Sequence, residues 1–380
     1  MIFINKLSDK NLHIITHDIP LPANYGGVVD LFFKITSLHG LGVKIHLHCY
    51  HSGKQPQPEL LKYCESVDYY PRKKNAIMLF HSVPYIVQSR NDRSLLENLK
   101  KDDHPILMEG IHCTYLLKNG SLKGRKIYVR LHNVEYRYYQ QLAKHESNIL
   151  KKIYYRFESY LLKNYEKSIA PFATFFAVSK MDAEIYRREF NCRNIEMLPV
   201  FIPWNKVNSQ PGKGSFCLYH GNLSINENEK AADWLLNNVF NMLEIPFVVA
   251  GKDPSLPLQS LAHNHSYTCM VVNPSDSELQ DLVQKAQINI LPSFNVTGVK
   301  LKLLNALYNG RHCIVNRAGA EGTETNQLCS IAESADDFKK LIQLLFDKEF
   351  GDDKITARNE HLQAIYDNEK NARQLISWIY

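Results

Sequence analysis

The stretch that most constrains the fold is 291–315, which reads LPSFNVTGVKLKLLNALYNGRHCIV. An apolar run over 288–291 stops at Pro292, a residue that cannot continue a β-ladder. Apolar residues then recur at partly helical spacing until Gly310, a common helix terminator. A short apolar strand follows. The order of strand, loop, helix and strand favours a parallel sheet with a crossover helix.

The loop in this stretch is a candidate anion site. Starting at Ser293, it delivers to the helix N-terminus Thr297, Gly298, Lys300 and Lys302. Free backbone N–H groups and a partial positive charge at a helix N-terminus attract anions. Lysines in the first turn are unfavourable with respect to the helix dipole, and a bound diphosphate would explain them. Two solvated surface lysines are the alternative.

The same alternation of short apolar strands and amphipathic helices runs along the whole chain. At 380 residues the chain is long enough for two cores. The pattern is interrupted by prolines and glycines between 199 and 214, so we place a domain boundary there. The predicted domains are 1–205 and 206–368, and a last helix at about 369–380 is expected to pack back on the first domain.

The composition excludes several classes of protein. Hydrophobic residues make up 44% of the chain and charged residues 22%, as in soluble globular proteins. No run approaches the roughly 18 apolar residues of a membrane span. Residues 1–9 lack the features of a signal peptide, so the expected location is cytoplasmic. Eight scattered cysteines without a CxxC pair indicate reduced thiols rather than disulfides or a zinc site.

The positive charge is concentrated in one segment. Residues 118–167 contain twelve lysines and arginines against four acids, a net charge of +8, whereas the whole chain carries +6. A local basic excess suggests a polyanionic partner or an anionic membrane surface. A long solvated helix face is the alternative.

The first half opens with a strand, a loop and a helix that begins at Gly26 and Gly27. A double glycine lets a ligand approach the helix start closely. The pair does not form GxGxxG, and a tight turn without a ligand is the alternative.

Two later strands carry a histidine and a glutamate at or just past their ends. One pair is Glu109 with His112, and the other is His132 with Glu135. Ligands of open α/β sheets bind outside the carboxyl ends of the strands. His132 and Glu135 could act as a general base and its orienting acid, with His112 and Glu109 as the competing pair. Satisfied polar loop residues are the alternative for both.

Several short motifs resemble GT-B glycosyltransferases of the retaining family 4, the glycosyl transferases group 1, especially bacterial surface-polysaccharide enzymes. They are 17–27, 130–139, 176–179, 220–230 and 292–315. The resemblance implies an α/β GT-B fold, in which two doubly wound Rossmann-like domains face each other across a cleft. The first domain would bind the acceptor and the second the nucleotide-sugar donor.

The chain departs from the family motif at the donor site. The family has two glutamates eight residues apart, and these positions align with Thr297 and Asn305. An amide at 305 can still hydrogen-bond a ribose or base. The family glycine matches Gly221, the following arginine position reads Asn222, and the phosphate-binding lysine corresponds to Lys230. Lys300 or Lys302 would take over part of the electrostatic role.

The resemblance implies a hexosyltransferase that moves a sugar from a nucleotide-diphosphate sugar to a polysaccharide or lipid-linked glycan. Retention is expected, with His132 orienting the sugar or acceptor and Lys300 meeting phosphate charge. No Asp-x-Asp motif is present, so neither metal nor cofactor is expected beyond the nucleotide sugar as co-substrate. The basic segment would place the enzyme at the inner face of the plasma membrane.

Other readings remain open. The absent glutamates favour a non-catalytic GT-B-like protein that binds a nucleotide sugar or supports a partner. A sugar-nucleotide 2-epimerase shares the fold but normally needs catalytic acids that the sequence does not place. Nucleic-acid binding is not expected, because it would leave the motifs at Gly26, His132 and Gly298 without a purpose.

Overall fold

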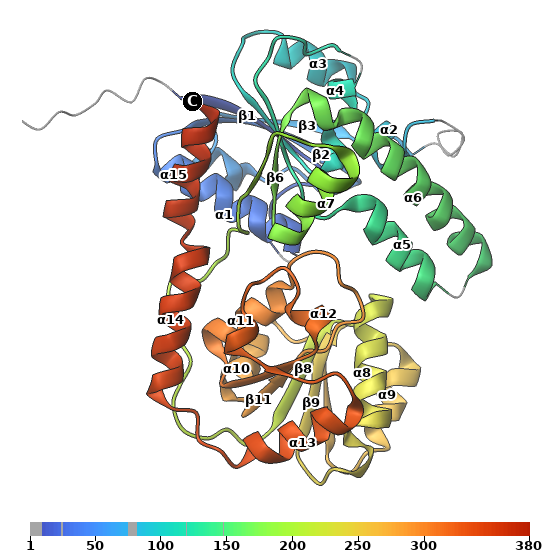
Figure 1. Ribbon diagram of the computed structural model, residues 1–380, viewed down its shortest axis with the longest axis vertical. Coiled ribbons are helices and arrows are strands. Elements are labelled where there is room, and N and C mark those ends of the chain that lie inside the picture. The colour runs from blue at the N-terminus through green and yellow to red at the C-terminus, as the bar shows by residue number, and fades with distance from the viewer. Residues whose placement is uncertain (1–9, 24–25, 75–81, 119, 147) are drawn as a thin grey trace, which may run out of the picture. The chain divides into compact units, whose positions relative to one another are not determined.

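The computed structural model shows two compact units, each built on its own parallel sheet (Figure 1). Unit 1 combines residues 1–203 with 366–380, and unit 2 consists of 204–365. The residues that the structure describes are 10–23, 26–74, 82–118, 120–146 and 148–380.

Unit 1 contains a seven-stranded sheet in which neighbouring strands are parallel. The order is β3-β2-β1-β4-β5-β6-β7, so the chain changes its direction across the sheet between β1 and β4. Ligands of such sheets bind at this switch point. The strands are β1 (Asn11–Thr16), β2 (Lys44–His51), β3 (Ser66–Pro71), β4 (Ile106–Glu109), β5 (Ile127–Arg130), β6 (Thr174–Ala177) and β7 (Ile195–Met197).

Helices cover both faces of this sheet. Side chains alternate between the faces, so Ile106 and Met108 of β4 enter one core while Leu107 enters the other. The helices are α1 (Gly26–Gly40), α2 (Tyr85–Gln88), α3 (Arg93–Leu99), α4 (Tyr115–Lys118), α5 (Glu135–His145), α6 (Ile149–Ile169), α7 (Lys180–Phe190) and α15 (Asn368–Ile379), with 3-10 turns at Pro58–Lys62, Ile111–Cys113 and Ala170–Phe172.

Helix α15 belongs to unit 1, although the chain reaches it only after unit 2. It packs beside α1 (Figure 1), and its residues Ala372 and Leu375 enter the α1 core. The hydroxyl of Tyr128 donates to the carbonyl oxygen of Trp378 at 3.0 Å. The hydrophobic core on this face of unit 1 is therefore completed by the last helix.

Unit 2 repeats the architecture with six parallel strands in the order β10-β9-β8-β11-β12-β13, so its switch point lies between β8 and β11. The strands are β8 (Cys217–Asn222), β9 (Phe247–Lys252), β10 (Thr268–Val272), β11 (Ile288–Ile290), β12 (His312–Val315) and β13 (Ser330–Ile331). The helices are α8 (Asn226–Asn238), α9 (Leu256–His263), α10 (Asp276–Lys285), α11 (Leu301–Asn309), α12 (Arg317–Ala320), α13 (Ala335–Phe346) and α14 (Asp352–Tyr366), with 3-10 turns at Phe240–Met242 and Asn326–Leu328.

The predicted α/β class with two doubly wound sheets is confirmed. Two helix starts have clear physical reasons. The proline of α9 lies in the first turn, where a missing N–H costs little, and Ser255 caps the helix. Asp352 and Asp353 form the first turn of α14, where acids favour the helix dipole. The acceptor and donor roles assigned to the two predicted domains stay predictions.

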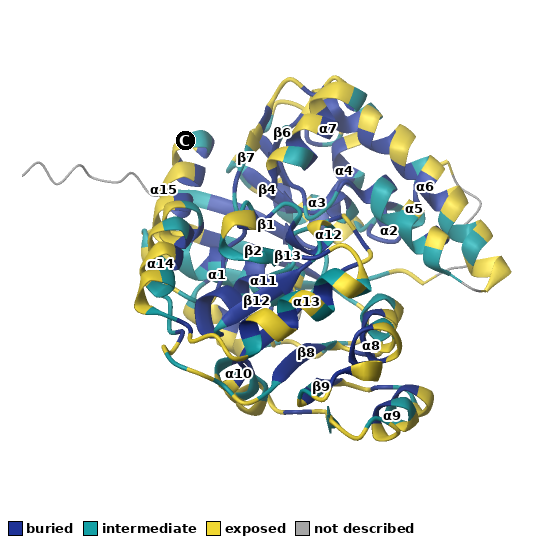
Figure 2. Cartoon of the chain, turned by 60° about the horizontal axis from the view of Figure 1, so that its bottom comes forward, coloured by how far each residue is buried: buried dark blue, intermediate teal, exposed yellow. Residues whose placement is uncertain are grey.

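The strands of the two sheets are more buried than the rest of the described chain. Figure 2 shows the strands largely as buried residues, and exposed residues lie mainly on helices and loops. Six of the eight cysteines are buried, as expected for reduced thiols, whereas Cys269 is exposed on the edge strand β10. Among the described residues, no helix combines the length and the apolar content that crossing a bilayer requires.

Candidate functional site

Glu227, in the first turn of α8, organises the switch point of unit 2. The Oγ of Ser293 donates to one of its carboxylate oxygens at 2.8 Å, and Nδ2 of Asn295 lies 3.3 Å from the other. The Oδ1 of Asn295 accepts the backbone N–H and the hydroxyl of Thr297 at 2.9 and 2.8 Å. A carboxylate from α8 therefore fixes the loop that follows β11.

Lys302 supplies a positive charge beside this loop. Its Nζ donates to Oδ1 of Asn228 at 3.1 Å and lies 5.1 Å from the ring centre of Tyr219. Loss of hydration lowers the pKa of Lys302 to about 8, which Glu227 partly opposes and Lys300 reinforces. Within the described chain no carboxylate comes within ion-pair distance of this ammonium. Its charge is therefore available to an anion.

Lys300 has a different place from Lys302, although the sequence suggests similar roles. It is the N-cap residue of α11, and its Nζ donates to the carbonyl oxygen of Thr297 at 2.5 Å. It thereby closes the loop across Gly298, whose φ of 69° lies in the left-handed region that favours glycine.

The other predicted donor residues divide into two groups. A Cβ at Gly221 would meet the side chain of Asn228 at 3.2 Å, so this glycine lets α8 approach the strand closely. The backbone carbonyl of Asn222 accepts a hydrogen bond from Nδ2 of Asn228 at 2.9 Å. Gly221 and Asn222 therefore form the first group, which lies beside Asn228, the partner of Lys302. Asn305 instead accepts from Nδ2 of Asn309 within α11, and Lys230 lies exposed on α8.

His220, at the end of β8, is a buried residue of this site that the sequence does not single out. Burial lowers its pKa to about 3, and Lys302 adds to the effect, so the imidazole is neutral at pH 7. Its Nε2 is buried without a hydrogen-bond partner among the described residues.

At the switch point of unit 1, fully buried charged groups form a network around Lys34 of α1. Its ammonium donates to Asp30 at 3.1 Å and to the two carboxylate oxygens of Glu109 at 2.8 and 3.0 Å. Arg130 lies 3.4 Å from Asp30. Burial raises the pKa of Asp30, but Arg130 and Lys34 outweigh burial and hold it below its usual range. Burial also raises the pKa of Glu109, but Lys34 and His132 together outweigh burial and hold it below its usual range.

Three histidine rings lie beside this network, each from the end of a different strand. His132 Nε2 is 3.1 Å from Glu109, and the His17 ring lies 5.2 Å from that of His112 and 5.1 Å from that of His132. Burial holds the pKa values of His17 and His112 well below the usual range, so both are neutral. A Cβ at Gly110 would lie 2.9 Å from His112 Nδ1, so only glycine fits there without a shift.

The carboxylates and one histidine of this network have the spacing of a metal site. Ligand atoms of Asp30, Glu109 and His132 lie within 4.8 Å of one another. The ammonium of Lys34 already donates to both carboxylates. Because this cation would compete with a metal ion, the geometry favours a charge-paired network.

The pairing of His132 with Glu135 is corrected by the structure. His132 pairs with Glu109, whereas Glu135 is buried at the start of α5 near Glu166. Burial, and then Glu166, raises the pKa of Glu135 to about 8. Glu166 accepts the backbone N–H groups of Glu135 and Tyr136 at 3.0 and 3.1 Å. Glu135 thus belongs to the packing of α5 rather than to the histidine cluster.

We expect Glu135→Gln to stabilise the protein at high pH. The folded-state pKa of about 8 exceeds the ordinary value of 4.5. The contribution of Glu135 to the free energy of unfolding is therefore complete below about pH 4.5 and is lost as pH rises through about 8. The gain in the free energy of unfolding above pH 8 should be about 2 kcal/mol. It is smaller than the pKa shift of Glu135 alone would give, because Glu135 and Glu166 titrate together and share the effect. Thermal unfolding against pH measures it, with the exposed Glu184→Gln as control. Identical pH dependence of wild type and Glu135→Gln would contradict the expectation.

The double glycine begins α1, which follows β1. Gly26 is exposed and Gly27 is half-buried, and residues 24 and 25 lie outside the described part of the chain. The predicted ligand-binding role of this pair stays a prediction.

Sequence reasoning misses the residues that act through long-range contacts. Lys34, Glu227 and Asn228 lie on helices, and nothing local shows that they reach a strand end. His17 could have been found, because it follows β1 as His132 follows β5.

Comparison with known proteins supports this architecture. Residues 215–348 match the model of the glycosyl transferases group 1 family. Over 332 residues, 82% of this chain and 84% of its relative, the sequence is 28% identical to a 44.6 kDa protein in the cps region of Klebsiella pneumoniae.

Solved structures give the fold. A structure of S. aureus TarM in complex with fondaparinux, alpha-GlcNAc-glycerol and UDP has a TM-score of 0.67 and 9% identity, covering 97% of this chain and 99% of TarM. Anabaena HepE in complex with UDP and glucose has a TM-score of 0.62 and 9% identity, with coverage of 97% and 99%. The fold is therefore GT-B.

The fold and the family match together define the class. The chain is a glycosyltransferase of the GT-B type. Its second unit is similar to the glycosyl transferases group 1 over residues 215–348. Membership of family 4 in particular stays a prediction.

Proposed function

We propose that the protein transfers a sugar from a nucleoside-diphosphate sugar to a polysaccharide or lipid-linked glycan. The observation that carries the proposal is Lys302, a half-buried cation at the switch point of the unit that matches the group 1 model. The solved structures of TarM and HepE contain UDP, and the Klebsiella relative is a protein in the cps region. These findings support a nucleotide sugar as donor and a glycan as acceptor.

In this proposal unit 2 holds the diphosphate. When the bond between the anomeric carbon and the phosphate oxygen breaks, negative charge develops on the β-phosphate. The Lys302 ammonium and the first backbone N–H groups of α11 stabilise that charge. Because a side chain supplies the positive charge, the proposed reaction needs no divalent metal ion and should proceed in EDTA.

The proposed transfer retains the configuration of the sugar. The acceptor oxygen bonds to the anomeric carbon on the face that the phosphate leaves, and the leaving phosphate takes the acceptor proton. His132 orients the acceptor or the sugar, because its hydrogen bond to Glu109 at 3.1 Å fixes the ring. Lys300 supports the loop, and Glu135 has no part in the chemistry.

A donor screen tests the proposal. The protein is incubated with labelled UDP-, GDP- and ADP-sugars in EDTA, and release of the nucleoside diphosphate is followed with and without glycan acceptors. At least one donor should be hydrolysed slowly and transferred faster, and NMR of the product should show the retained anomer. His132→Ala should lower transfer by about 100-fold. The Kd of the nucleoside diphosphate should not change, because His132 is on unit 1.

Two results would contradict the proposal. Failure of every nucleoside diphosphate to bind in calorimetry would remove the donor site from unit 2. Tight binding without turnover, under any acceptor, would favour the non-catalytic alternative. Lys123→Ala, an exposed change on unit 1, is the matched control for His132→Ala.

A further inference from the structure

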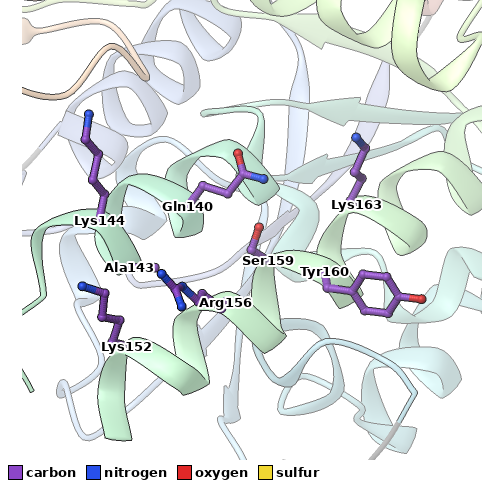
Figure 3. Close-up of a pocket in the computed structure, with 8 residues that line it drawn as sticks. All are labelled: Gln140, Ala143, Lys144, Lys152, Arg156, Ser159, Tyr160 and Lys163. Carbon is purple, nitrogen blue, oxygen red and sulfur yellow. The ribbon is translucent and has the colours of Figure 1, made fainter. Parts of the chain in front are cut away.

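Helices α5 and α6 form a hairpin with a basic groove between them. The helices lie side by side in Figure 1, and Figure 3 shows the side chains that surround a hollow of about 500 Å³. The lining residues are Gln140, Ala143, Lys144, Lys152, Arg156, Ser159, Tyr160 and Lys163. Four of them are cations and none is an acid, so the groove is suited to an anion.

The cations of the groove are mostly without internal counter-charges. Lys163 lies 3.6 Å from Glu189. Within the described part of the chain, Lys144, Lys152 and Arg156 form no ion pair. Clustered like charges repel one another, so an external anion would relieve the repulsion.

A second stripe on α6 is apolar and exposed. Ile149, Ile153 and Phe157 are four residues apart and therefore share one face, on which they are 73%, 58% and 47% exposed. Leu150 beside them is 78% exposed. The basic stripe of Lys152 and Arg156 runs immediately next to this face at the same spacing. The third side of α6 is buried in the unit 1 core through residues such as Leu162 and Ile169.

A helix with adjacent basic and exposed apolar stripes has the pattern of a segment lying at a membrane surface. The basic side chains meet lipid phosphates, and the apolar side chains enter the boundary of the acyl chains. A soluble polyanion would neutralise the positive charge of the groove but would leave Ile149, Leu150 and Ile153 exposed to water. The two stripes together therefore favour a lipid surface over a soluble ligand.

We infer that the α5–α6 hairpin docks the protein on an anionic bilayer, with a lipid phosphate headgroup in the groove and the apolar stripe of α6 in the interface. This docking is independent of the sugar-transfer reaction at the two switch points.

Vesicle flotation of the full chain tests the inference. The protein should float with phosphatidylcholine vesicles that contain phosphatidylglycerol, should remain in solution with phosphatidylcholine alone, and should dissociate as salt is raised. Lys152→Glu with Arg156→Glu should weaken binding by at least about 25-fold, taking roughly fivefold for each basic side chain near the surface. Ile153→Ser with Phe157→Ser should also weaken it, although the charge is unchanged.

A matched control separates the groove from net charge. Lys123→Glu with Arg188→Glu makes the same charge change at exposed positions outside the groove, and should bind vesicles like the wild type. Calorimetry with UDP and GDP on all variants separates docking from the donor site, because none of the three pairs of substitutions touches unit 2.

Three results would overturn the inference. They are equal binding to neutral vesicles, equal losses in the groove variant and the control, and saturation of the groove by free inorganic phosphate in a protein that does not float. The last result would assign the groove to a soluble phosphate compound.

Discussion

Replacing Lys302 by methionine is expected to lower donor turnover by about 100- to 1,000-fold, the usual cost of removing one group that stabilises charge in a transition state. Methionine keeps an apolar stem against Tyr219 but removes the ammonium. Because the charge on the leaving phosphate grows during the reaction, kcat should fall more than the affinity for UDP or GDP. Steady-state kinetics and calorimetry on the same variant measure the two effects.

The pH profile gives a second test of the same residue. The lowered pKa of Lys302, about 8, means that the free enzyme loses this charge as pH rises through that value. The wild-type kcat/KM should therefore fall above about pH 8. Lys302→Arg should be slower at neutral pH but should keep its rate above pH 8, because guanidinium stays protonated.

Lys300→Met is the matched control for Lys302→Met. The Lys300 ammonium donates to the Thr297 carbonyl, so its loss should loosen the loop and reduce turnover much less. Full activity of Lys302→Met, or an identical loss in both variants, would show that the donor phosphate does not bind at Lys302.

Lys34→Met is expected to destabilise unit 1 by about 3–5 kcal/mol. The substitution removes the ammonium that bridges Asp30 and Glu109, so two carboxylates are left in the core with less compensation. Arg130 continues to contact Asp30, whereas the Glu109 carboxylate keeps, among the described residues, only the hydrogen bond from His132. For a domain of this size the loss corresponds to a fall in Tm of about 10 °C, measurable by scanning calorimetry.

Two further variants define the cause of this destabilisation. Lys62→Met removes one member of an exposed pair with Glu59 and should leave Tm unchanged. Adding Glu109→Gln to Lys34→Met should recover part of the loss, because the buried negative charge then disappears. A Tm of Lys34→Met equal to that of the wild type would show that water or a rearrangement compensates the carboxylates.

Most of the fold could be predicted because it depends on local patterns. Apolar runs mark the strands, and caps such as Ser179 and Ser275 mark helix starts. Local patterns do not predict the order of the strands in each sheet, because that order depends on pairings between residues far apart in the sequence. The α/β alternation restricts those pairings to doubly wound sheets without giving the register.

The site could be predicted only in part. The end of a strand points to His132, because ligand-binding groups gather there, whereas Gly221 is implied by the family resemblance. Adjacency in sequence, however, suggests His132 with Glu135, and the first turn of α5 carries that glutamate to Glu166 instead. The carboxylate Glu227 lies 66 residues before the serine it binds, so no local pattern reveals it.

The return of α15 to unit 1 has a consequence for biosynthesis. A ribosome releases 1–203 first, yet the helix that covers one face of this sheet is made after all of unit 2. Until then the nascent chain exposes apolar residues such as Leu31 and Ile35 that α15 later helps to bury, a state that chaperones recognise. Unit 2 is contiguous and can fold in the meantime. The part of the protein that is translated first is therefore the last to mature.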